Sequence, residues 1–214
     1  MNKPRVHWSK TLIVSLAISV LLIVADLVIK WVVELNCVEG LRYEVIPNFF
    51  YITKSYNTAI AFSIGSNLGV AGRIINILIS LVMSVLIYFF WLTHDHKITK
   101  WERVVGVLLG AGAVGNLIDR AFYWQGITGF DGVIDMFQFY LGGGPSAPMG
   151  FFNPFATFNF ADACLVVGIA LLLVITIVDM IKKPDPLKND PRLEKPQPIQ
   201  TAEEKPEDTP KEGE

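Results

Sequence analysis

The sequence has little cysteine, little histidine and little charge for its length. Its 214 residues include 2 cysteines and 3 histidines. Cys37 and Cys164 lie far apart, so we expect neither a disulfide framework nor a metal site. Only 18% of the residues are charged and the net charge is -2, which leaves no basic surplus for nucleic-acid binding. What the sequence has instead is 52% hydrophobic residues and a mean hydropathy of +0.44, which is typical of a membrane protein.

Four long apolar segments each approach the roughly 20 residues that a helix needs to cross a bilayer. These predicted spans cover residues 11–33, 74–92, 104–123 and 160–181. The first span follows basic residues, as a secretory signal peptide does, but it is long and lacks a small-residue cleavage site. We therefore interpret it as an uncleaved anchor. The third span has a face of small residues, which favours close helix packing: Gly106, Gly110, Gly112 and Gly115.

Three further segments complete the domain organisation. Residues 34–65 contain a stretch rich in β-branched and aromatic residues with a Pro-Asn turn, which predicts a small β module. Residues 125–159 form a long loop rich in glycine and proline. Residues 182–214 hold more than half of the 12 prolines and much charge, so we expect a disordered tail. The predicted fold is a mostly α integral membrane domain over 1–181, with four transmembrane helices and the β module between helices 1 and 2.

The distribution of lysine and arginine predicts the orientation of the chain. Four spans place both termini on one side, together with the connection between the second and third spans. That side carries more Lys and Arg than the opposite side, as cytoplasmic loops do. We therefore expect both termini to be cytoplasmic and the β module to lie on the outer face.

Carboxyl groups inside predicted spans are unusual, because charge within a bilayer is costly. Asp26, Asp119 and Asp162 lie at similar depth, toward the outer ends of spans one, three and four. Asp135 lies in the outer loop, and Lys30 follows Asp26 by one helical turn. The sequence thus predicts a polar site near the outer membrane surface.

Each of these acids also has a structural interpretation. Asp26 and Lys30 are spaced for a helix ion pair, and Asp119 with Arg120 and Asn116 forms a self-satisfied polar cluster.

Asp162 has no cation within one turn, and Asn159 is better placed to cap the fourth span, so a purely structural role for Asp162 is disfavoured. For Asp135, the alternative to a functional role is that it is a solvated acid in a loop.

Two carboxyl groups without a histidine, a cysteine cluster or a serine–base pair allow few reactions. If two of them share one water, their repulsion raises one pKa, so that one acts as a base and the other as an acid. This is the arrangement of aspartic proteases. The spacing of the residues does not show which two carboxyl groups meet.

Five motifs, in this order along the chain, resemble the lipoprotein signal peptidases (signal peptidase II). They are Asp26 with Lys30, Asn57-Thr-Ala-Ile-Ala-Phe-Ser63, Gly115-Asn-Leu-Ile-Asp-Arg120, Val133-Ile-Asp135 and Phe158-Asn-Phe-Ala-Asp162. Each motif alone is weak, whereas five in sequence across four spans are highly specific.

The resemblance implies a four-helix aspartyl endopeptidase of the bacterial inner membrane. Such an enzyme removes signal peptides from diacylglyceryl-modified prolipoproteins, cutting before the lipidated cysteine, and it needs no metal or cofactor. The resemblance implies that Asp135 and Asp162 are catalytic. It also implies that a set of other residues lines or supports the site: Asp26, Lys30, Asn57, Asn116, Asp119, Arg120, Asn159 and Ala161. We expect a monomer in contact with membrane lipid, with the β module cradling the substrate and the loop that carries Asp135 gating it.

Two features depart from the family pattern. Ala59 and Ile60 stand where the family has Gly and Ala, and the segment Leu141 to Thr157 is long. Two other functions remain open: a small proton-coupled or ion-coupled transporter, and a non-catalytic lipid-binding or scaffold protein. A transporter is disfavoured, because the sequence lacks repeat-related halves and its acids gather at one surface.

Overall fold

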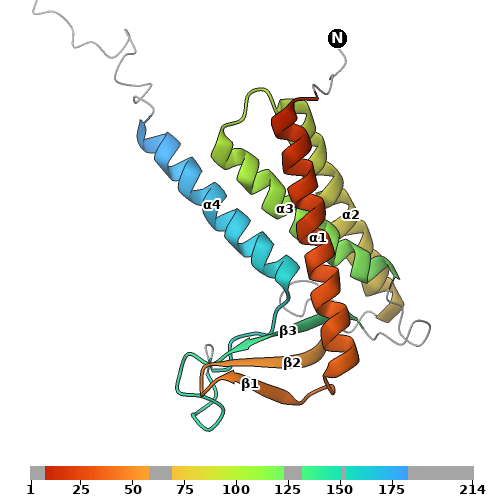
Figure 1. Ribbon diagram of the computed structural model, residues 1–214, viewed down its shortest axis with the longest axis vertical. Helices are drawn as coiled ribbons and strands as arrows, with labels where there is room; N and C mark the ends of the chain where they lie inside the picture. Colours follow the sequence, from red (N-terminus) through yellow and green to blue (C-terminus); the bar gives the residue numbers. More distant parts are fainter. Residues whose placement is uncertain (1–7, 58–68, 123–131, 151–152, 183–214) are drawn as a thin grey trace, which may run out of the picture. The chain divides into compact units, whose positions relative to one another are not determined.

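The computed structural model describes residues 8–57, 69–122, 132–150 and 153–182. These residues form four helices and a three-stranded sheet (Figure 1). The helices are α1 (Lys10–Asn36), α2 (Gly69–His94), α3 (Lys100–Phe122) and α4 (Phe160–Lys182). Each is long and apolar enough to cross a membrane, with the spanning part of α2 being Ala71–His94. The predicted fold class, four membrane-spanning helices with a small β module, is confirmed.

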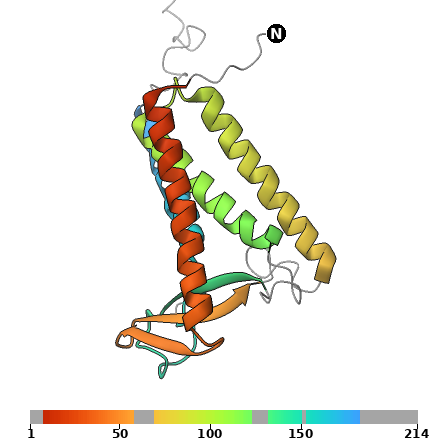
Figure 2. The same ribbon diagram turned by 45° about the vertical axis from the view of Figure 1, so that its right-hand side comes forward.

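The helices differ in how far they are covered by protein. Half of the most apolar part of α3 is buried (50%), against 22% for α1, 22% for α2 and 11% for α4. α3 packs against both α1 and α2, and Figure 2 shows it between them. The other helices present apolar side chains outward, as expected of surfaces that face lipid. α3 is therefore the central helix.

The glycines of α3 make close packing possible, as the sequence analysis predicted. A Cβ atom added at Gly106 would lie 3.0 Å from the Trp91 ring, and one at Gly110 would lie 2.9 Å from the Tyr88 ring. One at Gly112 would lie only 2.5 Å from the Ala161 carbonyl oxygen. Because no side chain fits at Gly112, α3 and the first turn of α4 are in backbone contact there.

The sheet consists of β1 (Arg42–Ile46), β2 (Phe50–Asn57) and β3 (Val133–Phe139), all antiparallel and in the order β1-β2-β3. The prediction that residues 133–139 belong to a loop is wrong, because they form a strand. The segment is almost entirely buried, and its apolar residues gain both burial and backbone pairing by joining β2 as a third strand. The register pairs Ser55 with Asp135 and Asn57 with Val133, so the end of β2 lies beside the start of β3.

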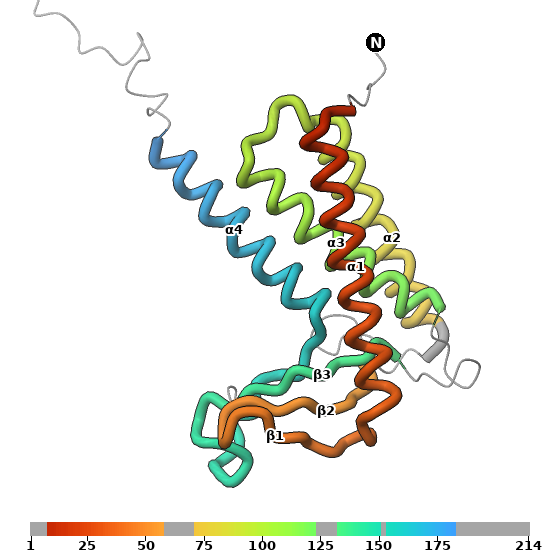
Figure 3. The backbone as a smooth tube through the Cα atoms, viewed as in Figure 1, coloured from red at the N-terminus to blue at the C-terminus, as the bar shows by residue number. Residues whose placement is uncertain are grey.

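α1 and α3 both contact β3, which brings the sheet against the ends of the helices (Figure 3). After β3, the chain folds back on itself, and the buried Asn153 donates from Nδ2 to the carbonyl oxygens of Gly144 (3.3 Å) and Pro148 (2.9 Å). All these elements, with α4 as far as Ile177, form one compact unit of the structure. The predicted tail, 182–214, lies outside the described residues except for Lys182, which is the last residue of α4. The departures at Ala59 and Ile60 lie outside the described residues as well.

Candidate active site

Asp135 lies in β3 and is almost completely buried, with 3% of its surface exposed. Its carboxylate accepts two hydrogen bonds from amide groups. Asn57 at the end of β2 donates from Nδ2 to Asp135 Oδ2 (3.0 Å), and Asn159, just before α4, donates from Nδ2 to Asp135 Oδ1 (2.8 Å). Both oxygens are thus held in place by groups from other elements, which argues against the interpretation of Asp135 as a solvated loop acid.

Asn159 also leads from Asp135 to the second predicted catalytic residue. Its Nδ2 lies 3.1 Å from Oδ1 of Asn116 on α3, and it donates to that oxygen. Asn116 in turn donates from Nδ2 to Asp162 Oδ1 (2.7 Å). A continuous chain of hydrogen bonds therefore joins Asp135 to Asp162 through two buried amides. The sequence reasoning did not find this connection, because the two aspartates lie on different elements.

Asp162 is held at the start of α4 by a reciprocal capping interaction. The Asp162 backbone N–H donates to Asn159 Oδ1 (2.8 Å), and the Asn159 backbone N–H donates to Asp162 Oδ2 (3.3 Å). This is the pattern of a capping box, with Asn159 as the cap. The two interpretations of Asp162, as part of a cap and as a member of a polar site, are thus compatible.

The backbone connects β3 to this helix start. Phe137 N–H donates to the Phe158 carbonyl oxygen (2.8 Å), and Phe158 N–H donates back to Phe137 (3.1 Å). The residue before Asn159 is therefore fixed to the strand that carries Asp135. This pairing sets the distance between the strand and the first turn of α4.

A buried ion network supports the site from α1. Lys30 Nζ lies 2.7 Å from Asp26 Oδ2 and 2.6 Å from Asp119 Oδ2, and none of the three side chains is more than 1% exposed. Asp26 Oδ1 accepts from the backbone N–H of Ala161 (2.8 Å), next to Asp162. The predicted Asp26–Lys30 pair is present. The predicted local cluster around Asp119 is corrected, because its charge is balanced across helices by Lys30.

Arg120 reaches toward α2, where its Nη1 donates to Ser80 Oγ (2.8 Å). Its positive charge interacts electrostatically with the carboxylates of Asp162, Asp119 and Asp135. The sequence reasoning missed Ser80. The signal was available, since Asn76, Ser80 and Ser84 recur every four residues in an apolar helix, and all three are buried.

The environment of Asp135 favours its protonated form. Burial, reinforced by the nearby charge of Asp162, raises the pKa of Asp135 to about 7, although the hydrogen bonds from Asn57 and Asn159 act in the opposite direction. Near neutral pH this carboxyl can therefore hold or release a proton. Two neighbouring carboxyl groups that share one proton provide both a base and an acid.

The chain is similar to known proteins over most of its length. Residues 18–178 match the family model described as signal peptidase (SPase) II. A lipoprotein signal peptidase of Bacillus subtilis (strain 168) is 30% identical over 171 residues, covering 78% of this chain and 94% of the relative. One from Staphylococcus aureus is 32% identical over 171 residues, covering 80% and 92%. A solved structure of a bacterial membrane enzyme is 26% identical with a TM-score of 0.62, covering 86% of this chain and 98% of that one.

Proposed function

Because the chain belongs to the signal peptidase II family, and is thus a bacterial membrane protease that removes signal peptides from lipoproteins, we propose that Asp135 and Asp162 are its catalytic pair. The proposed reaction is hydrolysis of the peptide bond that precedes the lipidated cysteine of a diacylglyceryl-modified prolipoprotein. Its products are the signal peptide and the lipoprotein with a free amino group on that cysteine.

In the proposed mechanism one carboxylate removes a proton from water as the water attacks the peptide carbonyl carbon. The other carboxyl is protonated, donates a hydrogen bond to the developing oxyanion and then protonates the leaving nitrogen. The raised pKa of Asp135, about 7, supports a pair that retains one proton near neutral pH. The two roles, base and acid, are assigned to the pair as a whole.

The observation that carries this proposal is the hydrogen-bond chain from Asp135 through Asn159 and Asn116 to Asp162. It fixes two carboxyl groups from different elements near each other, and fixed geometry is what acid–base catalysis of this kind requires. Arg120 and the Asp26–Lys30–Asp119 network would act as support, and Ala161 would contribute through its backbone bond to Asp26.

The position of the site fits a substrate that is itself a membrane helix. The proposed catalytic dyad, Asp135 and Asp162, lies where the sheet meets the ends of the membrane-spanning helices. A signal peptide can therefore cross the bilayer while its cleavage site lies near the surface. We propose that the sheet lies on the outer face and cradles the residues around the lipidated cysteine. The diacylglyceryl chains would remain in the lipid, both termini would be cytoplasmic and the enzyme would act as a monomer.

Cleavage of a diacylglyceryl-modified prolipoprotein by the purified full-length protein in detergent tests the proposal. Asp135→Asn and Asp162→Asn should each lower the rate by roughly 10²- to 10⁴-fold, the usual contribution of one acid–base group. Asp179→Asn is the matched control, because Asp179 is exposed on α4. Full activity in either dyad variant, with its folding intact, would refute the assignment.

A further inference from the structure

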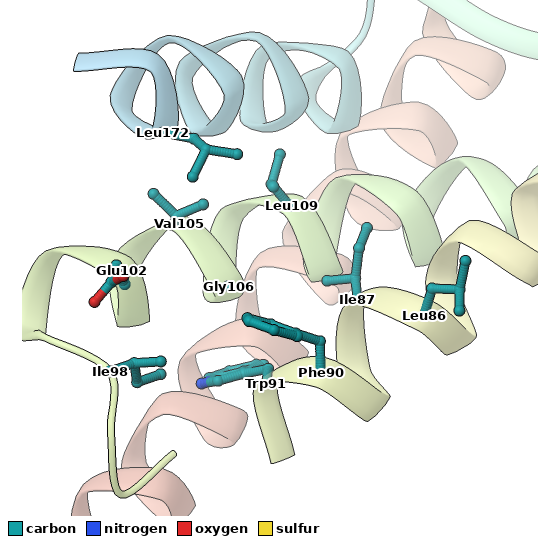
Figure 4. Close-up of a pocket in the computed structure, with 10 residues that line it drawn as sticks. All are labelled: Leu86, Ile87, Phe90, Trp91, Ile98, Glu102, Val105, Gly106, Leu109 and Leu172. Carbon is teal, nitrogen blue, oxygen red and sulfur yellow. The ribbon is translucent and has the colours of Figure 1, made fainter. Parts of the chain in front are cut away.

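A second feature of the structure lies at the opposite end of α2 and α3 from the dyad. An open cavity of about 390 Å³ is formed by three helices (Figure 4). Its apolar lining comes from the last third of α2, the first half of α3 and the middle of α4, and it includes Leu86, Phe90, Trp91, Val105, Leu109 and Leu172. None of these residues takes part in the proposed reaction.

The cavity begins where α3 and α4 cease to be in close contact. The two helices meet at Gly112 against Ala161 and at Gly168 against the Leu109 side chain. One turn after Gly168, Leu172 already lines the cavity. Small residues thus draw the helices together near the dyad, and larger side chains leave a wedge beyond them.

The lining indicates a hydrocarbon occupant. Glu102 is the only ionisable side chain among the described residues that line the cavity, and its Oε2 accepts from the Thr99 backbone N–H (2.7 Å) in the capping box of α3. The other polar atom of the lining side chains is Trp91 Nε1, a buried donor without a hydrogen-bond partner among the described residues. The lining thus offers one N–H donor and is otherwise hydrocarbon. At this depth in a membrane, such a space is filled by a lipid tail or by a helix of another protein.

The shape of the cavity favours lipid. A helix with its side chains is about 10–12 Å wide, whereas an acyl chain is a single file of methylene groups. A cavity of about 390 Å³ wedged between three helices of this chain suits the acyl chain.

Charge at the mouth of the cavity points to the headgroup. Lys97 and Lys100 are exposed and flank Ile98, which lines the cavity. Arg103, nearby on α3, is paired with Asp95 and is less available. We propose that an anionic phospholipid binds here, with one acyl chain in the cavity and its phosphate at Lys97 and Lys100. Such a lipid would support α4, whose first turn carries Asp162, as a structural ligand.

The test uses the full-length protein in vesicles of phosphatidylcholine that contain a small amount of phosphatidylglycerol with a photoreactive acyl chain. Cross-linked residues are mapped by mass spectrometry. We expect labelling to concentrate on 86–91 and 102–109, and unlabelled phosphatidylglycerol to compete with it. Photoreactive phosphatidylcholine with the same chains is the headgroup control. Labelling spread evenly over the lipid-facing sides of all four helices would overturn the proposal, since it would indicate ordinary surrounding lipid.

Two pairs of variants sharpen this test. Leu172→Trp fills the cavity and should reduce the labelling severalfold, whereas Leu173→Trp, on the neighbouring exposed residue outside the lining, should not. Replacing Lys97 and Lys100 by glutamine should lower the preference for phosphatidylglycerol by about fivefold per lysine, and replacing both by arginine should preserve it. Unchanged labelling in Leu172→Trp, or equal labelling by both lipids in the parent protein, would refute the site. Prolipoprotein cleavage is measured separately, so failure here leaves the proposed function untouched.

Discussion

The two ends of the helix assembly are stabilised by different means. Near the sheet, the buried residues of α1 and α3 include Asp26, Lys30, Asn116 and Asp119, which are held by ion pairs and hydrogen bonds. At the other end, the buried cluster is Leu12, Trp91 and Val107, with glycines of α3 against aromatic rings. Buried charges require fixed partners, whereas apolar packing adapts to small changes. Burying the charged groups near the sheet costs folding free energy, and the same end of the helices holds the proposed catalytic residues.

The largest expected effect is on the charged end. Lys30→Met leaves two carboxylates buried without their cation, so the free energy of unfolding should fall by about 3–5 kcal/mol. Thermal unfolding in detergent measures this. Lys54→Met is the control, because Lys54 pairs with Glu34 at a longer 3.6 Å in a partly exposed position, and about 1 kcal/mol is expected. Equal losses in the two variants would show that the buried network contributes no more to the free energy of unfolding than a partly exposed ion pair.

Asn159→Ala should separate activity from stability. It removes the amide that binds Asp135 and Asn116, and loss of one such preorganised donor lowers the rate by about 10²- to 10³-fold. Asn153→Ala removes another buried amide, in the fold after β3, and should cost stability with normal cleavage per folded molecule. If Asn159→Ala kept normal cleavage, the hydrogen-bond chain would not be what positions the pair.

Glycine substitutions compare the two ends directly. Gly112→Ala places a methyl group against a backbone oxygen that cannot move aside, so we expect a loss of about 1–3 kcal/mol and lower cleavage, because α4 shifts with Asp162. Gly106→Ala meets only the Trp91 ring and should cost less, without an effect on cleavage per folded molecule. Gly150→Ala, in open space, is the control. Equal effects at Gly106 and Gly112 would contradict the comparison.

The smallest expected effect is a change of pH dependence. Asn57 donates to the ionised form of Asp135 and so lowers its pKa; Asn57→Ala should raise that pKa further above its value of about 7. Since Asp135 then loses its proton at higher pH, the upper limb of the cleavage profile should move up by about one pH unit. Asn36→Ala, an exposed residue at the end of α1, should leave the profile unchanged. A downward shift would contradict the assignment.

Much of the fold was predictable from the sequence because its causes are local. A bilayer demands about 20 apolar residues per span, and each helix shows that length in its own composition. The Asp26–Lys30 pair follows from helical spacing alone. The strand at 133–139 was missed because its hydrophobic residues lie in a segment rich in glycine, and only β2, about 80 residues earlier, provides its partner.

The sequence by itself determined which residues had to lie in the membrane and which polar residues were out of place there. Only the tertiary structure decided their partners: that Asp119 pairs with Lys30 on another helix, that Arg120 reaches Ser80, and that Asn159 connects Asp135 to Asn116. The physical reason is range. Hydropathy and helical spacing act within a few turns of chain, whereas an ion pair or hydrogen bond across elements exists only after packing has brought the elements together.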